Sequence, residues 1–448
     1  MNSRGPLLGA TLSVALLTSA CGGGGGGASP ISIPPLPPAK DGKYFKHIVI
    51  MIQENRTFDN LFATFPGADG TTVGKTHDGG TLPLLKEPLV PNPDLSPSNG
   101  YQGDWIVAYN GGRMNAFDLL RVEGHPGSYL YRYVDPAQIQ PYWTLAKSYV
   151  LADHMFQTEG SGSYTAHQDL IAGGTMIDDT HALIDFPNVL PWGCDSPPGT
   201  TTKLIDAANH ISKPGPFPCL KYQTLRDTLD AKGLTWRYYA PKVNGGDPGG
   251  QLWSAFDSIR AVRYGPEWGT NVVWPETTVF QDIDRDSLPD VSWVIPDFQN
   301  SDHPGGGSDT GPSWVAQVVN AIGKSPAWKD TAIVVVWDDW GGWYDHVSPP
   351  KPLTYGGLGS RVPMLVISPF AKKGYVMHAQ YEFGSIIKLV EENWDLPSLG
   401  TTDVRAASFL NDAFDFGQIP RAFATVKARY SLEYFLHQKP SGKPVDTE

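Results

Sequence analysis

Four short segments of the chain are almost continuously apolar, and they constrain the fold more than any other feature. They span residues 47–52 (HIVIMI), 291–296 (VSWVIP), 332–337 (AIVVVW) and 363–368 (PMLVIS). Strands without polar alternation are typical of parallel sheets that are buried on both faces. Helical patterns at 224–231, 312–322 and 384–393 lie between or after them. This alternation predicts an α/β sandwich with a mostly parallel central sheet and helices on both faces. Functional residues are then expected beyond the carboxyl ends of the strands.

The net negative charge of the chain argues against a nucleic-acid partner. The 448 residues include 46 Asp and Glu against 34 Lys and Arg, a formal net charge of −12. A chain of this sign does not present the broad basic face that binds nucleic acid, so we expect no nucleic-acid partner. Its carboxylates are available for a cation instead.

The first 43 residues differ in composition from the rest. Residues 1–21 combine a positive end, an apolar run and small residues before Cys21, which is the layout of an export signal and too short for a spanning helix. They resemble a bacterial lipoprotein signal, in which Cys21 is lipidated and associates with a membrane. Simple secretion is the alternative, and both place the protein in the periplasm, at the cell surface or outside. Residues 22–43 are a Gly- and Pro-rich tether, 44–437 one folded domain and 438–448 a polar tail.

Two cysteines remain after Cys21. In an oxidising compartment a disulfide between Cys194 and Cys219 is the simplest outcome, and two free thiols are the alternative.

Two of the predicted strands run directly into oxygen-bearing side chains. Glu54 and Asn55 follow the first strand, and Asp338 and Asp339 follow the third. Three carboxylates and an amide oxygen at two strand ends form a candidate site for one hard divalent cation. The alternative is structural: Asn55 caps the next helix, and the two aspartates begin a solvated glycine turn.

A candidate nucleophile lies in residues 158–174. If a helix begins at Ser163, its free amide groups and dipole face the hydroxyl and attract a phosphate. A neighbouring metal ion would lower the pKa of the hydroxyl, so that serine attacks without a histidine base. Helix capping is the alternative role, and Ser161 is a competing nucleophile.

Histidines are candidate acids for the leaving group. His303 and His346 lie in Gly- and Pro-rich loops after predicted strands, where a side chain reaches a site more readily than a core. Each is equally compatible with an ordinary surface position. His167, on the helix after Ser163, is expected to be a packed or hydrogen-bonded neighbour.

Five ordered blocks between residues 47 and about 416 resemble the bacterial phosphoesterase family of acid phosphatases and phosphatidylcholine-type phospholipases C. They are HIVIMIQENRTFDNLF (47–62), GSGSYTAHQDLIAGG (160–174), SDHP (301–304), DTAIVVVWDDWGGWYDHV (330–347) and RVPMLVISPFAKKGYVMH (361–378). The resemblance implies an alkaline-phosphatase-like fold, one divalent metal and a phosphoseryl intermediate. It makes Ser163 the nucleophile and a metal contact, and it implies metal ligation by Glu54, Asn55, Asp338 and Asp339. It gives His303 and His346 roles in phosphate stabilisation and leaving-group protonation.

Two departures from the family pattern stand out. Thr165 replaces a proline near the nucleophile, which the first turn of a helix tolerates. Relatives often carry a His-Ser-His stretch where residues 99–108 have none, so one phosphate-contacting histidine is missing unless His77 or His125 substitutes.

These features predict an exported, metal-dependent phosphoesterase that acts by double displacement. The substrate is a phosphoester, either a phospholipid cleaved in the manner of phospholipase C or a monoester cleaved by an acid phosphatase. A surface lipoprotein that binds without catalysis is the alternative class. Sulfate ester hydrolysis is disfavoured because the Cys/Ser-x-Pro-x-Arg motif of sulfatases is missing from the sequence. Oxygen ligands suit calcium, magnesium or manganese without choosing among them.

Overall fold

The computed structural model describes residue 1 and residues 34–90, 95, 100–208, 210–212, 214–350 and 357–442. The predicted export signal, the lipidation site Cys21 and most of the tether lie outside these residues. Within them, no helix is both long enough and apolar enough to span a membrane.

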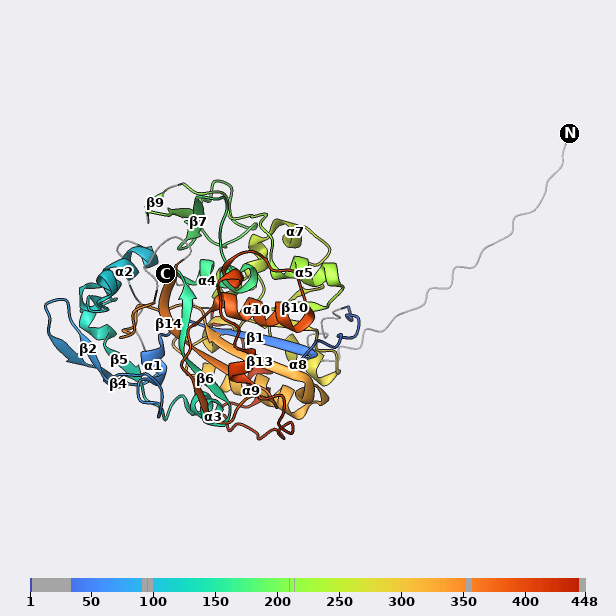
Figure 1. The fold of residues 1–448 in the computed structure, drawn as a ribbon. Coiled ribbons are helices and arrows are strands. Elements are labelled where there is room, and N and C mark those ends of the chain that lie inside the picture. Colours follow the sequence, from blue (N-terminus) through green and yellow to red (C-terminus); the bar gives the residue numbers. More distant parts are fainter. Residues whose placement is uncertain are drawn as a thin grey trace. The chain divides into compact units, whose positions relative to one another are not determined.

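A nine-stranded sheet forms the centre of the domain (Figure 1). Its order is β11-β10-β12-β1-β13-β14-β6-β15, and β16 continues the outer edge beside β6. All strands except β14 run in the same direction. In sheet order the strands are β11 (Val272–Val273), β10 (Trp236–Tyr239), β12 (Val291–Val294), β1 (His47–Gln53), β13 (Thr331–Trp337), β14 (Leu358–Ile367), β6 (Val150–Thr158), β15 (Tyr375–Met377) and β16 (Tyr381–Glu382).

Strand β14 corrects one part of the prediction. Its apolar run was expected to be parallel like the other three, but it is antiparallel to both β13 and β6. All ten of its residues are buried, because helices cover both faces of the sheet whatever the direction of the strand. A continuous apolar run therefore reports burial and carries no information about direction. Strand β6 was not predicted, since Asp153, His154 and Gln157 interrupt its apolar pattern.

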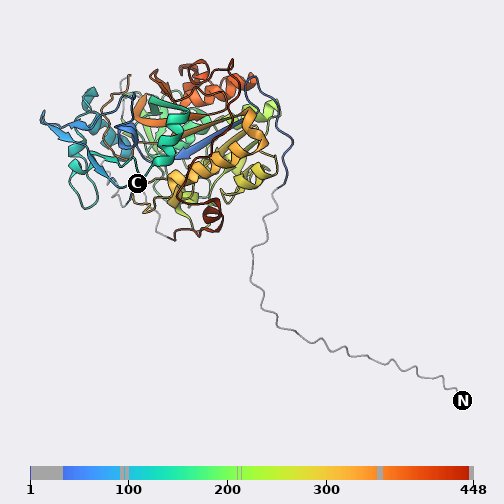
Figure 2. The same cartoon turned by 90° about the horizontal axis from the view of Figure 1, so that it is seen from below.

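Three predicted helices are present and lie on the two faces of the sheet. Residues 224–231 correspond to α5 (Leu225–Lys232), which begins with a capping box between Thr224 and Asp227. Residues 312–322 correspond to α9 (Gly311–Lys324), and 384–393 to α10 (Phe383–Trp394). Figure 2 shows α10 on one side of β1 and α9 on the other. With α10 pack α4 (Ser163–Ala172) and, beyond it, α5; with α9 pack α3 (Gln140–Ser148) and α8 (Thr278–Asp284).

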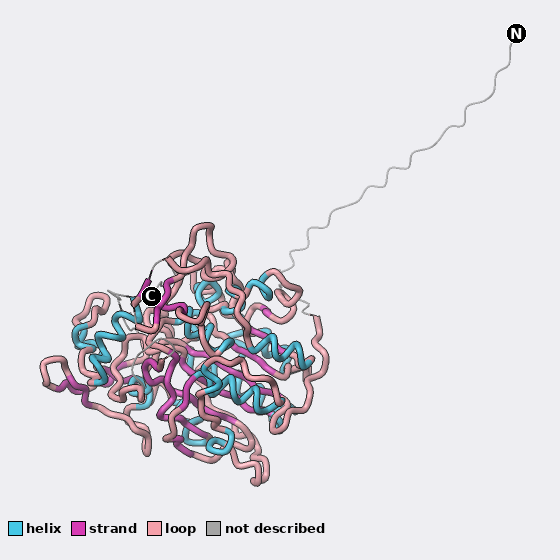
Figure 3. Tube along the Cα trace, turned by 45° about the horizontal axis from the view of Figure 1, so that its top comes forward, coloured by secondary structure: helices cyan, strands magenta, loops and turns pink. Residues whose placement is uncertain are grey.

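Shorter elements surround this framework, as the loop-rich trace in Figure 3 shows. The small strands are β2 (Val73–Lys75), β3 (Thr81–Pro83), β4 (Leu85–Glu87), β5 (Arg132–Val134), β7 (His181–Ile184), β8 (Lys203–Asp206) and β9 (Ile211–Ser212). The remaining helices are α1 (Phe58–Phe62), α2 (Gly100–Tyr109), α6 (Pro248–Leu252), α7 (Arg260–Arg263), α11 (Leu410–Ala413) and α12 (Leu432–His437). The predicted disulfide is confirmed: Cys194 and Cys219 are bonded, and they bracket β8 and β9.

A separate aromatic cluster joins the region before β6 to the loop that follows β13. Trp105 of α2, Phe117 and Tyr131 pack there against Trp340 and Tyr344. Because Trp340 directly follows the two aspartates after β13, this packing holds the loop in place at the carboxyl edge of the sheet.

Candidate active site

The carboxyl ends of β1 and β13 bring four predicted ligands to one place. The two strands are adjacent and parallel, and Gln53 pairs with Trp337 at their last residues. Beyond that pair, the backbone N–H of Asn55 donates to Asp338 Oδ1 at 3.1 Å. Asn55 has a φ of 50°, and a Cβ at Gly341 would lie 2.3 Å from the carbonyl oxygen of Asn55. The glycine after the two aspartates is therefore required for the two loops to approach each other.

Ser163 faces this cluster from a third element. It is the first residue of α4, and its Oγ lies 3.1 Å from Glu54 Oε2, 3.3 Å from Asn55 Oδ1 and 3.1 Å from Asp339 Oδ2. A hydroxyl has one proton, so it can donate to only one of these three acceptors. The side chain is 5% exposed. The convergence predicted from the sequence is thus present in the structure, and Thr57 rather than Asn55 caps α1.

Helix α2 positions the turn that precedes Ser163. The backbone N–H of Gly160 donates to Gln102 Oε1 at 2.9 Å, and a Cβ at Gly160 would lie 1.7 Å from the Trp105 ring. Residues 100–108, part of the segment in which the family resemblance implies histidines, therefore support the turn before Ser163 with aromatic packing. No side chain caps α4, whose N-cap is Gly162, so its first amide groups and positive dipole end lie beside the hydroxyl.

Thr165 and Ser161 complete the local structure of this helix start. Thr165, which replaces the family's proline, donates from its hydroxyl to the Gly162 carbonyl at 3.1 Å and also contacts the Ser161 hydroxyl. Ser161 Oγ accepts from the backbone N–H of Asp185 at 2.7 Å. The competing serine thus has structural partners in α4 and directly after β7, while Ser163 faces the carboxylates.

The electrostatics of the cluster fit a hard divalent cation. Burial, reinforced by the charges of Asp338 and Asp339, raises the pKa of Glu54 well above its usual value. Burial also raises the pKa of Asp338, and its Oδ2 atom is buried without a hydrogen-bond partner. The donors are all oxygen atoms, from carboxylates, an amide and a hydroxyl. Calcium, magnesium and manganese prefer ligands of this kind, and such an ion would offset the repulsion among the carboxylates of Glu54, Asp338 and Asp339.

His303 is the predicted histidine that reaches the cluster. It follows β12, and its Nε2 accepts from Asn55 Nδ2 at 3.2 Å while Nδ1 contacts the Pro304 carbonyl oxygen. The tautomer with hydrogen on Nδ1 satisfies both contacts. The Trp253 ring lies on one side of this imidazole, with 5.9 Å between ring centroids.

The other predicted or alternative histidines contact different residues. His346 Nδ1 lies 2.7 Å from Asp59 Oδ2, and its Nε2 lies 3.2 Å from Asp69 Oδ1, so both ring nitrogens face these aspartates rather than Ser163. His77 pairs with Asp118, and His125 packs against Tyr129 with ring centroids 4.4 Å apart. These contacts turn the three rings toward partners other than Ser163.

Comparison with known sequences identifies the group to which this arrangement belongs. Residues 45–397 match the Phosphoesterase family, which covers more than half of the chain. The chain belongs to the Phosphoesterase family. The match includes Ser163, His303 and the four predicted ligands, Glu54, Asn55, Asp338 and Asp339.

Curated relatives of this phosphoesterase-family chain are phospholipases C by name. It is 25% identical over 91% of its length to a non-hemolytic phospholipase C of Pseudomonas aeruginosa, and it spans 62% of that protein. It is 28% identical over 84% of its length to phospholipase C B of Mycobacterium tuberculosis, and it spans 78% of that protein. A solved protein of the alkaline phosphatase superfamily from Vibrio parahaemolyticus aligns with 82% of this chain. The alignment covers 71% of the solved protein, at 11% sequence identity and a TM-score of 0.37.

Two further side chains, His167 and Trp253, surround the Ser163 cluster, and only Trp253 was not expected from the sequence. His167 was expected to be a hydrogen-bonded neighbour, and its Nε2 lies 2.7 Å from Glu54 Oε1. Burial lowers the pKa of His167 to about 3, so the neutral ring donates to the Glu54 carboxylate and orients it. Trp253 stacks on His167, with 6.2 Å between centroids and 4° between planes, and it also contacts His303. No sequence signal distinguishes Trp253 from the other 13 tryptophans.

Proposed function

We propose that this chain is a metal-dependent phosphoesterase in which Ser163 is the nucleophile. One observation carries the proposal: the Ser163 hydroxyl, at the uncapped start of α4, lies within 3.3 Å of acceptor oxygens of Glu54, Asn55 and Asp339. A hydroxyl in a buried acidic cluster has no evident structural purpose, because it can satisfy only one of three acceptors. Membership of the Phosphoesterase family supports the same conclusion.

The residues divide the work of a double displacement. Ser163 Oγ passes its proton to an adjacent carboxylate, Glu54 or Asp339, and forms a bond to phosphorus as the bond to the ester oxygen breaks. The amide groups at the start of α4 hold the phosphoryl oxygens. His303 lies on the Asn55 side of the hydroxyl and, when protonated, supplies a proton to the departing alkoxide. Water then attacks the phosphoserine and restores the hydroxyl.

Glu54, Asn55, Asp338, Asp339 and Ser163 would hold one divalent cation. When bound, such an ion would act as a Lewis acid that lowers the pKa of the serine hydroxyl and neutralises charge on the phosphoryl group. The hydrogen bond from His167 fixes the orientation of Glu54, so this histidine is a positioning residue.

For the substrate we propose a phospholipid-type phosphodiester, cleaved in the manner of phospholipase C. The names of the Pseudomonas and Mycobacterium relatives favour this choice over an acid phosphomonoesterase. We also propose export of the protein, and association of a lipidated Cys21 with a membrane. Both rest on the sequence of residues 1–21.

An activity panel on metal-stripped protein tests the proposal. The protein is reconstituted separately with calcium, magnesium and manganese, then assayed for phosphate release from a monoester and diacylglycerol release from phosphatidylcholine. We expect turnover only with metal, and diacylglycerol as the main product. Phosphate release alone would favour the phosphomonoesterase. Metal binding without turnover of either substrate would favour a non-catalytic binding protein.

A further inference from the structure

Strand β6, which ends five residues before Ser163, contains a local irregularity at its centre. On one side, Val362 and Met364 of β14 pair with Met155 and Ala152, so three steps on β6 face two on β14. On the other side, Ala152 pairs with Met377 at the end of β15, and pairing resumes only in β16. The ladder is thus interrupted on both sides of β6 at Asp153 and His154. Such bulges re-aim side chains and are common next to functional sites.

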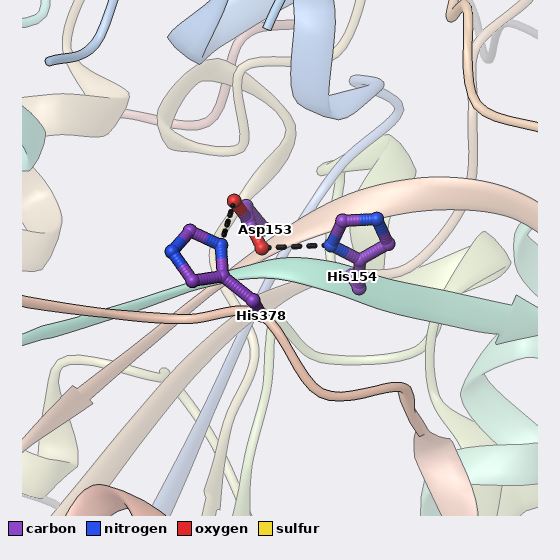
Figure 4. Close-up of side chains that lie close together, drawn as sticks. All are labelled: Asp153, His154 and His378. Atoms are coloured by element: carbon purple, nitrogen blue, oxygen red, sulfur yellow. Dashed lines mark hydrogen bonds and ion pairs between the residues drawn. The ribbon is translucent and has the colours of Figure 1, made fainter. Parts of the chain in front are cut away.

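Because the pairing is interrupted, the side chains of the neighbouring residues Asp153 and His154 contact each other. Consecutive side chains of a regular strand point to opposite faces. Here Asp153 Oδ1 nevertheless lies 2.8 Å from Nδ1 of the next residue, His154. Asp153 Oδ2 lies 2.8 Å from Nδ1 of His378, the residue that follows β15. Figure 4 shows the two imidazole rings on either side of the carboxylate, each with Nδ1 toward it.

The surroundings hold these three side chains in position. The backbone N–H of Asp69 donates to Asp153 Oδ2 at 2.8 Å, and the Asp69 carboxylate lies 3.4 Å from His154 Nε2. Arg361 Nη1 donates to the backbone carbonyls of Asp69 and Asp153, at 2.6 and 2.9 Å. Asp153 is fully buried, whereas the His378 side chain is 60% exposed, so the cluster has a rigid base and an open side.

We propose that Asp153, His154 and His378 form a second metal-binding site, for a borderline transition ion such as Zn²⁺. Their ligand atoms all lie within 4.8 Å of one another. Ligands about 2.1 Å from a tetrahedral ion are ~3.4 Å apart, so the 2.8 Å separations between each Nδ1 and the carboxylate would open by about 0.6 Å on binding. Two imidazoles and one carboxylate select transition ions over calcium or magnesium, in contrast to the oxygen-only cluster at Ser163.

The outer contacts match those of a histidine metal site. With Nδ1 bound to the ion, each neutral ring carries its hydrogen on Nε2. The hydrogen of His154 then points at the Asp69 carboxylate, an outer partner that orients the ligand. The open side at His378 leaves the remaining coordination positions to water. The proposal is independent of the chemistry assigned to Ser163.

Zinc titration of the full-length protein tests the site. The protein is stripped of metal and equilibrated with excess Mg²⁺, a hard ion that suits the oxygen-only cluster, and Zn²⁺ is added in a calorimeter. We expect His378→Ala to lose one zinc-binding event relative to wild type. Asp69→Asn should keep the event but weaken it by about 10–100-fold. His378 is largely exposed, so its removal should leave folding intact, and circular dichroism checks this.

His181→Ala is the matched control. His181 also places Nδ1 beside an aspartate, 3.2 Å from Asp178 Oδ1, but the pair is joined by no second imidazole in the described structure. It should bind zinc as wild type does, and Zn²⁺ should raise the melting temperature of wild type and control more than that of His378→Ala. Equal zinc stoichiometry and affinity in wild type and His378→Ala would overturn the proposal. An equal loss in the control would do so as well.

Discussion

Replacing Ser163 by alanine removes the one oxygen atom on which the proposed chemistry depends. Ser161, two residues earlier, is the natural comparison, because its hydroxyl is equally buried but has structural partners. Losing the nucleophile should lower kcat by roughly 10⁴-fold or more, which corresponds to ~5.5 kcal/mol of transition-state stabilisation. Ser161→Ala should still form the phosphoenzyme, since its hydroxyl makes no contact with the carboxylate cluster in the described structure.

The order should reverse for stability: Ser161→Ala should lower the free energy of unfolding more than Ser163→Ala does. Ser161→Ala leaves the buried N–H of Asp185 without its 2.7 Å acceptor, which costs about 1–3 kcal/mol. Ser163→Ala in metal-loaded protein should cost at most ~1.5 kcal/mol, because Glu54 and Asp339 keep the cation as a partner. Thermal melting measures stability, and acid quenching followed by intact mass spectrometry detects the phosphoenzyme. A Ser163→Ala enzyme that still forms the phosphoenzyme, or a Ser161→Ala enzyme that cannot, would refute the assignment.

Three further outcomes follow from the geometry. Metal removal should abolish turnover and lower the melting temperature, since an ion at 100 times its Kd stabilises the fold by about 2.7 kcal/mol; a melting curve insensitive to chelator contradicts this. His303→Ala should reduce kcat by about 10²–10⁴-fold for alkyl esters but less for p-nitrophenyl esters, whose leaving group needs no proton; equal losses would exclude a general acid. The pKa of His346 is raised. Burial and the charge of Arg361 disfavour the charged ring, but the hydrogen bond to Asp59 and the negative charges of Asp59 and Asp345 outweigh them. His346 also faces Asp69. A raised folded pKa stabilises the protein below the unfolded value of ~6.5 and loses this effect as pH rises through the folded value. Melting curves should therefore show the largest gap between wild type and His346→Gln at acidic pH, and a gap that widens with pH would contradict the assignment.

The elements with strong local signals could be predicted from the sequence. Apolar runs marked β1, β12 and β13, and the capping pattern at Thr224 marked the start of α5. The prediction missed β6, because the polar residues Asp153 and His154 interrupt its apolar pattern. These two residues lie at a bulge in the pairing of β6 with β14, which the sequence does not reveal. It also assigned the wrong direction to β14, because burial on both faces hides strand polarity.

The sequence by itself determined which side chains are available at the strand ends and at the start of α4. Parallel strands expose their carboxyl ends on one edge, so Glu54, Asn55, Asp338 and Asp339 could be expected together. Only the tertiary structure decided which histidine joins them, because His303 and His346 occupy similar loops and differ in the partners that distant segments bring. It likewise decided that His154 and His378 share one carboxylate. Contacts between residues more than 200 positions apart depend on packing of the whole sheet, which local patterns do not encode.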